Sequence, residues 1–197
     1  MFDGYTYSMQ HRIQATDADL IAATIDGDER AFAEIVRRYE PVVAKTVIGM
    51  LGPGDEADDT GQAVMIKLYK ALPKFRGEAR LSTFITRIAV TTSLDALRRR
   101  KRNFARFFSP ANNEDQTLEQ VPSGENHARD LEQRQLIQSA LLGLSPDFRA
   151  VAVLRLQQGY STEETAQMLK ISEGTVFSRL SRARKHLKAA LLEEMSQ

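Results

Sequence analysis

The segment from Ser161 to Leu187 constrains the fold more than any other part of the chain. It has the pattern of two short helices joined by a tight turn. Ser161 can cap the first helix, and Glu164, three residues later, completes a capping box. Ser172 is a second cap, and Thr175 follows it three residues into the next helix. Two capped helices this close together predict a helix-turn-helix.

The second helix of this pair has two different faces. One face is an apolar stripe at helical spacing, formed by Val176, Leu180, Ala183 and Leu187. The remaining positions are mostly polar or basic: Phe177, Ser178, Arg179, Ser181, Arg182 and Lys185. A helix divided in this way can pack its stripe on the first helix and present its open face to the major groove of DNA. The alternative is an amphipathic surface helix whose basic face meets only water.

Composition limits which kinds of protein are compatible with this prediction. The 197 residues suffice for one medium domain or two small ones, and the formal net charge is only +1. The average charge therefore gives no sign of nucleic-acid binding, although the charge is strongly segregated along the chain. The absence of cysteine excludes a disulfide framework and a thiolate site, and it fits a reducing compartment. We expect neither a secretory signal nor direct membrane insertion, because the first residues lack an apolar run and no stretch approaches the ~18 apolar residues of a span.

Periodicity predicts an all-α protein of two small helical domains joined by a flexible linker. Caps at Thr16 or Asp17 and at Asp28 begin two helices, and Pro41 is a candidate kink in the second. The acidic run Asp55–Asp59 opens a third helix, where carboxylates suit the helix dipole, and a fourth runs from about Ser82 to Arg102.

A change of composition divides the chain. Residues 103–130 are rich in Asn, Pro, Ser, Gly and acidic side chains and have few apolar anchors, which is typical of a linker. Helical periodicity then returns, and Ser145-Pro146 marks a further helix start. The expected boundaries are a tail at 1–16, a first domain at 17–102, a flexible acidic linker at 103–130 and a second domain at 131–192.

A second concentration of positive charge closes the first domain, at residues 98–102 and at Arg106. Such a run can bind phosphates through release of counterions. The alternative is a solvated helix end, since basic residues favour the negative end of the dipole. Two basic helices in two tethered domains favour DNA, because the tether raises the effective concentration of the second contact.

The loop before the fourth helix reads FRGEARLSTF, from Phe75 to Phe84. Gly77 permits a tight backbone, and polar side chains gather at a helix entrance. Such a loop can hold an unstacked base by its polar edge beside an aromatic ring. Composition alone favours the plainer interpretation of a connection whose Phe75 and Phe84 belong to the core.

Two long segments carry a family resemblance. Residues 55–102 resemble the conserved second region of bacterial extracytoplasmic-function sigma factors, with an acidic start, a central Gln62, the FRG loop, an RIA helix and a basic end. Residues 144–187 resemble the fourth region, with its GTV, SRL and RAR core. The resemblance covers about 17–102 and 131–192.

The resemblance implies a sigma factor that binds core RNA polymerase and directs promoter recognition, DNA opening and transcription initiation. It implies no enzyme activity, cofactor or metal. The implied partners are the β′ clamp helices and β flap of the polymerase, promoter DNA and an anti-sigma factor. The implied location is the bacterial cytoplasm, with retention at the membrane by an anti-sigma factor.

The resemblance also assigns site residues. Those for the −10 element are Phe75, Glu78, Arg80, Thr83, Arg87, Asp95, Arg98 and Arg99. Those for the −35 element are Thr175, Phe177, Ser178, Arg179, Ser181, Arg182 and Arg184. Those for core polymerase are Asp58, Asp59, Gln62, Met65, Lys67 and Lys70.

The chain departs from the family pattern at four positions. Thr60 and Ala63 stand where Leu and Glu are usual, and Phe84 replaces a Trp. Phe177 stands where a basic residue is common, so it suggests apolar contact with a thymine methyl, or packing on a neighbour.

Two other classes of function remain open. One is a sigma mimic that sequesters an anti-sigma factor, against which both basic helices argue. The other is a helix-turn-helix regulator with an oligomerisation domain, which leaves the basic helix end and the FRGEAR loop unexplained. An enzyme is disfavoured, since there is no cysteine, the histidines are scattered and no phosphate-binding glycine loop appears. A metal held by Asp55–Asp59 is disfavoured because the dipole explains those acids.

Overall fold

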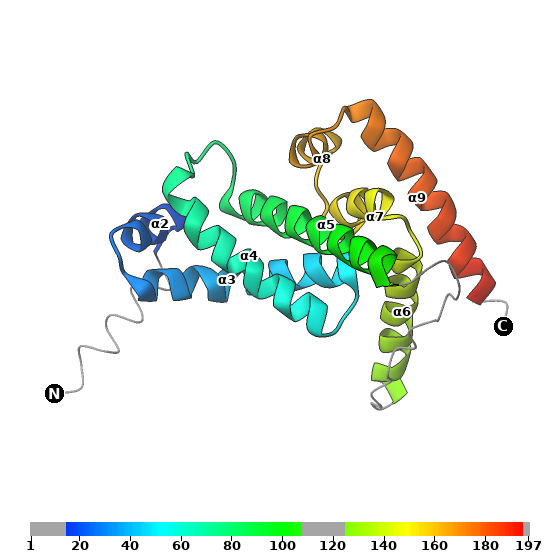
Figure 1. Cartoon of the computed structure of the whole chain (residues 1–197). Coiled ribbons are helices and arrows are strands. Elements are labelled where there is room, and N and C mark those ends of the chain that lie inside the picture. The colour runs from blue at the N-terminus through cyan, green and yellow to red at the C-terminus, as the bar shows by residue number, and fades with distance from the viewer. Residues whose placement is uncertain (1–14, 108–124, 195–197) are drawn as a thin grey trace.

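The structure, a computed structural model, describes residues 15–107 and 125–194 (Figure 1). Within these ranges every regular element is a helix, which confirms the all-α prediction. The longer helices are α2 (Asp17–Ile25), α3 (Glu29–Leu51), α4 (Asp55–Ala71), α5 (Leu81–Phe107), α6 (Glu125–Leu142), α7 (Pro146–Ala152), α8 (Thr162–Leu169) and α9 (Glu173–Glu194). A 3₁₀ turn, η1 (Leu72–Lys74), follows α4, and a widened turn, η2 (Val153–Gln157), follows α7. None of the helices in these ranges is both long and apolar enough to cross a membrane.

The predicted helix starts are confirmed in the first half. The Thr16 hydroxyl accepts a hydrogen bond from the Asp19 amide, and the Asp19 carboxylate accepts one from the Thr16 amide. The Asp28 carboxylate caps α3 by accepting from the amides of Arg30 and Ala31. Pro41 does not interrupt α3, which continues to Leu51.

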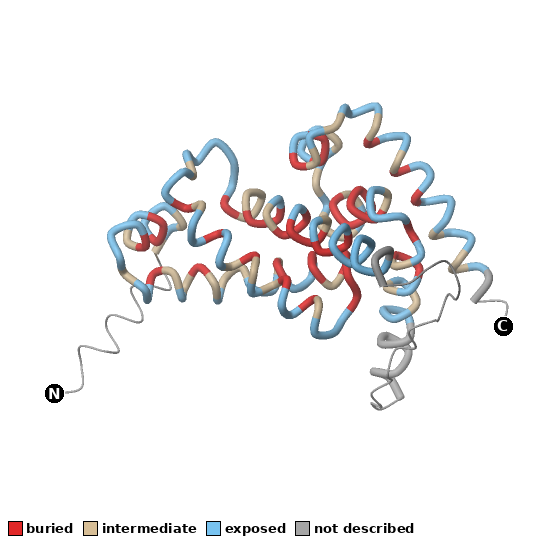
Figure 2. Tube along the Cα trace, viewed as in Figure 1, coloured by how far each residue is buried: buried red, intermediate tan, exposed pale blue. Residues whose placement is uncertain are grey.

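Helices α3, α4 and α5 enclose the core of the first half, whose fully buried members include Ile35, Val64, Leu68 and Ile85 (Figure 2). Helix α2 packs on α3 at one end of this bundle. There the Tyr39 hydroxyl donates to the Asp17 carboxylate at 2.5 Å.

An ion-pair cluster on α3 lies at the same end of the bundle. Glu34 accepts hydrogen bonds from the guanidinium groups of Arg37 and Arg38, each at 2.7 Å. The hydrogen bond from Arg37 is the largest cause that lowers the pKa of Glu34 to about 2.

Helices α8 and α9 form the helix-turn-helix of the second half, and α7 packs against it. The apolar stripe of α9 faces inward as predicted: Val176, Leu180 and Ala183 are buried, and Leu187 packs at the edge. Val176 and Leu180 meet Val151 of α7 and Ala166 of α8.

The two halves pack directly on one another. Ala150, Val153, Leu154 and Met168 of the second half join the same continuous core as α3, α4 and α5. Figure 1 shows α7 beside the middle of the molecule, with α9 along its outer edge.

The predicted linker is shorter than its composition indicated. Helix α5 continues to Phe107 and α6 begins at Glu125, so both helices reach into the segment 103–130. A scarcity of apolar residues does not exclude a helix, because a helical face that does not pack on a core needs few of them. Residues 108–124, like the predicted tail up to residue 14, lie outside the described residues.

Candidate functional site

Local hydrogen bonds set the geometry of the helix-turn-helix. The Ser161 hydroxyl accepts from the Glu164 amide at 3.1 Å, and the Glu164 carboxylate accepts from the Ser161 amide at 2.7 Å. The Ser172 hydroxyl accepts from the Thr175 amide at 3.2 Å, so the second cap is present as well. Between the helices, Lys170 adopts a left-handed conformation with φ of 54°, which ends α8.

The open face of α9 presents most of the residues assigned to the −35 element. Phe177 is 60% exposed. Ser178, Ser181, Arg182 and Arg184 are also exposed. This face offers hydroxyl and guanidinium donors around one aromatic ring, a set that can contact base edges and phosphates.

Two of the assigned residues have contacts within the protein. Thr175 is half-buried, and its hydroxyl lies 2.8 Å from that of Ser172, so it belongs to the cap. The Arg179 side chain is 24% exposed and pairs with Asp147 of α7 at 3.2 Å. Arg179 would have to give up this ion pair to reach a phosphate.

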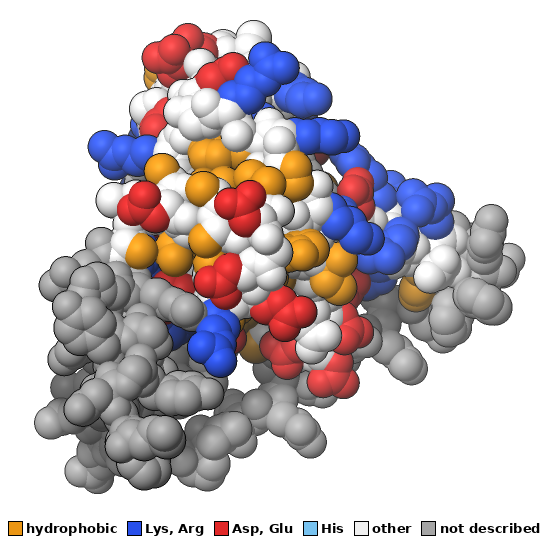
Figure 3. Space-filling view, turned by 90° about the vertical axis from the view of Figure 1, so that its left-hand side faces the viewer, with side chains coloured by type: hydrophobic (Ala, Val, Ile, Leu, Met, Phe, Trp, Pro, Cys, Tyr) orange, Lys and Arg blue, Asp and Glu red, His pale blue; other side chains and the backbone are white. Residues whose placement is uncertain are grey.

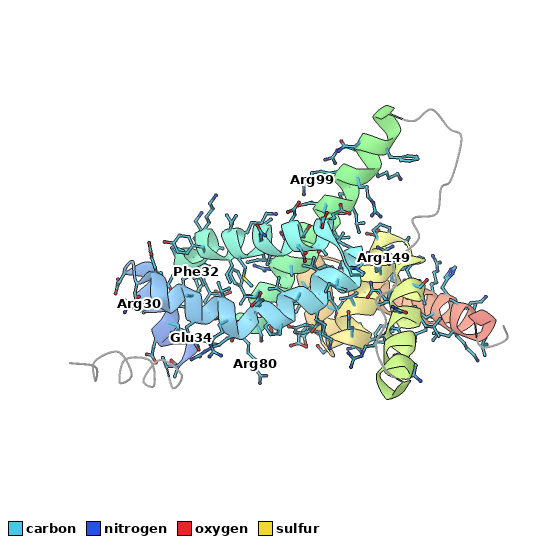
Figure 4. The ribbon with its side chains drawn as sticks, turned by 90° about the horizontal axis from the view of Figure 1, so that it is seen from below. Arg30, Phe32, Glu34, Arg80, Arg99 and Arg149 are labelled. Carbon is cyan, nitrogen blue, oxygen red and sulfur yellow. The ribbon has the colours of Figure 1, made fainter. Side chains whose placement is uncertain are left out.

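The loop before α5 combines packed aromatic rings with exposed polar groups. The rings of Phe75 and Phe84 pack with their centroids 4.9 Å apart, and the Arg87 guanidinium lies 5.4 Å from the Phe84 centroid. Phe75 is therefore part of the bundle, as the composition of the loop suggested. Glu78 and Arg80 are exposed, and Figure 4 shows Arg80 directed away from the helices.

The glycine in this loop permits the turn. Gly77 has φ of 73°, a conformation that favours glycine, and Thr83 is half-buried near the start of α5. The loop thus places Glu78 and Arg80 in solvent beside a rigid aromatic pair, where a base can be held by its edge.

Some of the basic side chains at the end of α5 form ion pairs within the protein. Arg98 pairs with Asp95 at 3.1 Å, and Arg100 pairs with Glu56 of α4 at 3.3 Å. Arg99 is exposed and lies on the part of α5 that extends beyond the bundle (Figure 4). The space-filling view of one end of the molecule shows Lys and Arg side chains gathered along one side (Figure 3).

Half of the residues assigned to core polymerase share a groove between α3 and α4. The groove has a volume of about 660 Å³ and includes Asp58, Gln62 and Met65 in its walls. Asp59, Lys67 and Lys70 are exposed, but they do not line it. The Lys67 ammonium donates to the Thr92 hydroxyl of α5 at 3.1 Å, so it also braces the bundle.

The groove adds residues that were not assigned to core polymerase from the sequence. Val36, Glu40 and Ala44 of α3 form its opposite wall, and Ile66 of α4 is 57% exposed beside it. Ile66 was detectable as an apolar residue off the buried stripe of Val64 and Leu68. On α3, Val36 belongs to an apolar stripe at helical spacing, but that stripe does not identify its partner, since only packing brings the two helices together.

The departures from the family pattern fall in different environments. Thr60 is buried, so it faces the bundle and not a partner, while Ala63 is half-buried. Phe84 keeps an aromatic ring at its position and packs on Phe75. In the described part of the chain, no group of three or more His, Cys, Asp or Glu side chains is placed to hold a metal ion.

Comparisons with known proteins agree with this geometry. The family model of Sigma-70 region 2 matches residues 35–103, and that of Sigma-70 region 4 matches residues 134–187. The chain is 35% identical over 176 residues to the ECF RNA polymerase sigma factor SigM of Mycobacterium tuberculosis, covering 89% of this chain and 85% of that one. It is also 35% identical over 176 residues to the ECF RNA polymerase sigma-E factor of Escherichia coli K12, covering 87% and 92%.

Two solved structures share the fold. One is CnrH in complex with the cytosolic domain of CnrY, with a TM-score of 0.60 at 26% identity, covering 87% of this chain and 94% of that one. The other is the sigma factor RpoE with the anti-sigma factor NepR from Bartonella quintana, with a TM-score of 0.65 at 24% identity, covering 81% and 96%. The two family matches and the identity over most of the chain lead to one conclusion: this protein belongs to the family of ECF RNA polymerase sigma factors.

Proposed function

We propose that this chain binds core RNA polymerase and directs promoter recognition, DNA opening and the start of transcription. The observation that carries the proposal is the exposed polar and basic face of α9, held over a buried stripe by two capped helix starts. In this arrangement the polymerase is the catalyst and the chain supplies the choice of promoter.

The α9 face reads the −35 element in this proposal. Arg182 and Ser181 contact base edges, Phe177 contacts a thymine methyl, and Arg184 contacts phosphate. The exposure of these side chains supports the assignment. Thr175 and Arg179 have secondary roles, because one is a cap and the other is paired with Asp147.

The loop before α5 and the basic end of α5 engage the −10 element. Glu78 and Arg80 hold a base displaced from the duplex, and Thr83 and Arg87 flank it at the start of α5. Phe75 supports this site through Phe84 and does not stack on the base itself, as its half-buried position suggests. Further along α5, Asp95, Arg98 and Arg99 lie along the edge of the duplex.

The groove between α3 and α4 receives the polymerase in this proposal. Asp58, Gln62 and Met65 lie in its walls, and Ile66 adds exposed apolar surface. A central apolar contact with a polar rim is typical of a specific protein interface. Asp59, Lys67 and Lys70 then belong to the rim.

The proposal includes control by an anti-sigma factor, which would keep the chain in the cytoplasm or at the membrane until it is released. The similarity to CnrH, solved with the cytosolic domain of CnrY, supports this part.

Run-off transcription with core polymerase tests the proposal. Adding the chain should produce promoter-dependent transcripts that the core enzyme alone does not make. A complete lack of stimulation on every genomic template would overturn it.

A further inference from the structure

The groove between α3 and α4 contains one residue that the fold itself does not explain, Gly61. Gly61 lies in the interior of α4. Glycine is among the least favourable residues there, because it loses more conformational freedom on folding than any other residue. A protein tolerates this loss where the backbone needs a positive φ, or where a neighbouring group leaves no room for a Cβ.

Neither reason applies to Gly61 within the described part of the chain. Its φ is not positive, unlike that of Gly54 just before α4. A Cβ built on Gly61 would meet no atom within 4 Å. Gly49 of α3 shows the opposite case, because a Cβ built there would collide with the Gln157 side chain. The space beside Gly61 is therefore left open by this part of the chain, and a partner can fill it.

This space belongs to the groove of about 660 Å³, which is long enough to hold a helix. Its wall on α3 extends from Val36 to Ile48, and its wall on α4 extends from Ala57 to Ile66. At 1.5 Å per residue these walls are about 18 and 14 Å long, or about three turns of a helix. The distance between two packed helices depends on the side chains at their contact, so a helix in the groove can come closest to α4 at Gly61.

The charge of the groove indicates what such a helix must carry. The charged residues in its walls are Glu40 on α3 and Asp58 on α4, and the other residues that line it are uncharged. Both side chains are exposed, and neither carboxylate forms an ion pair or a hydrogen bond with the residues that the structure describes. Because both walls carry negative charge, a helix with Arg or Lys on both flanks is complementary to the groove.

We infer that Gly61 determines which helix the groove accepts. Its lack of a side chain lets the backbone of a helix of core polymerase pass against α4, while Arg or Lys side chains of that helix reach Glu40 and Asp58. The inference rests on the proposed function, which assigns the polymerase to this groove. It adds Glu40 and Gly61 to the polymerase-binding residues, and it explains why α4 keeps a residue that weakens the helix.

Filling the space at Gly61 separates binding from stability. Gly61→Ala should raise the melting temperature, since alanine favours the helix and its Cβ meets no atom of the described chain. The same variant should bind purified core polymerase about fivefold more weakly, because an added methyl group overpacks a close contact. Gly61→Leu should weaken this binding by about tenfold or more. A glycine with only a structural role would show the gain in stability without the loss of affinity.

Gly174→Ala is the matched control for these variants. Gly174 lies in the first turn of α9, where a Cβ would be 3.9 Å from Ser172 Oγ, an ordinary contact. This variant should bind core polymerase as the natural chain does. Natural affinity of both Gly61 variants would overturn the inference. So would a natural chain that forms dimers which Gly61→Leu dissociates with no loss of core affinity, because the occupant of the groove would then be a second copy.

The charge of the groove is tested separately. Glu40→Gln should weaken binding of core polymerase about threefold to fivefold at low salt, and the difference should shrink as salt screens the charges. Asp26→Asn, which removes one negative charge from an exposed position outside the groove, should have no such effect. Natural affinity of Glu40→Gln at every salt concentration would refute the basic partner helix. Failure of the natural chain to bind core polymerase would instead count against the proposed function.

Discussion

The two basic surfaces of this sigma factor are built in different ways. On α9, a buried stripe and two capped starts hold the helix, and its outer face carries exposed Phe177 and Arg182. On α5, the basic side chains are partly engaged, Arg98 with Asp95 and Arg100 with Glu56. The second half of the chain also covers a neighbouring face of α5 through Tyr160. The comparison teaches that the outer side chains of α9 are mostly free of contacts within the protein, whereas several basic side chains of α5 are held in ion pairs.

The largest effect should come from the core that the two surfaces share. Leu154 is fully buried between the halves, so Leu154→Ala should lower the free energy of unfolding by about 2–5 kcal/mol. Because the core is continuous, the loss should appear in one cooperative urea transition that both halves follow. Val176→Ala, which lies in the helix-turn-helix core, is the comparison variant. Two separate transitions in the natural chain would show that the halves are independent.

A smaller effect separates base reading on α9 from phosphate contact on α5. Arg182→Ala should cost about 1–3 kcal/mol of binding to the preferred −35 sequence and relax specificity at one position. Arg98→Ala should weaken binding to all sequences alike and reduce the salt slope by about 1. Holoenzyme binding to promoter variants at several salt concentrations measures both. If Arg182→Ala weakened every −35 sequence equally, Arg182 would be a phosphate contact.

The cap that holds the helix-turn-helix should contribute less. Removing the Ser161 hydroxyl leaves the Glu164 amide without its acceptor, so Ser161→Ala should lower stability by about 1 kcal/mol. Chemical denaturation of the whole chain measures the change. Ser161→Asp restores an acceptor and should recover most of the loss. Failure of the aspartate to do so would indicate that the hydroxyl has another role.

The smallest effect concerns pH at the far end of the first half. The pKa of Glu34 is lowered to about 2 in the folded chain, below its ordinary value of 4.5. Its contribution to stability is therefore complete above about pH 4.5 and is lost as the pH falls toward 2. The melting temperature should fall less across this window in Glu34→Gln than in the natural chain. Hydrogen exchange should report the loosening at α2 and α3 before α8 and α9, and the reverse order would contradict the assignment.

Local chemistry made much of this protein predictable from its sequence. The caps at Thr16, Asp28, Ser161 and Ser172 depend on residues three positions apart at most, so the helix starts follow from short patterns. The inward stripe of α9 follows from helical spacing, because residues at such spacing share one face whatever the helix packs against. The family followed as well, since its motifs lie in continuous segments.

Tertiary structure alone decided the features that join distant segments. Nothing in the sequence around Arg149 distinguishes it from a surface arginine in a first helical turn. In the fold it is buried, and it donates to the Met50 carbonyl, 99 residues away. The position of Arg179 on α9 led to its assignment to DNA, but Asp147, 32 residues away, pairs with it. Packing of distant segments likewise produces the groove between α3 and α4 and the contact of Tyr160 with α5. The physical reason is that helical periodicity records which face of a helix is apolar, whereas the partner of that face is chosen by packing of the whole chain.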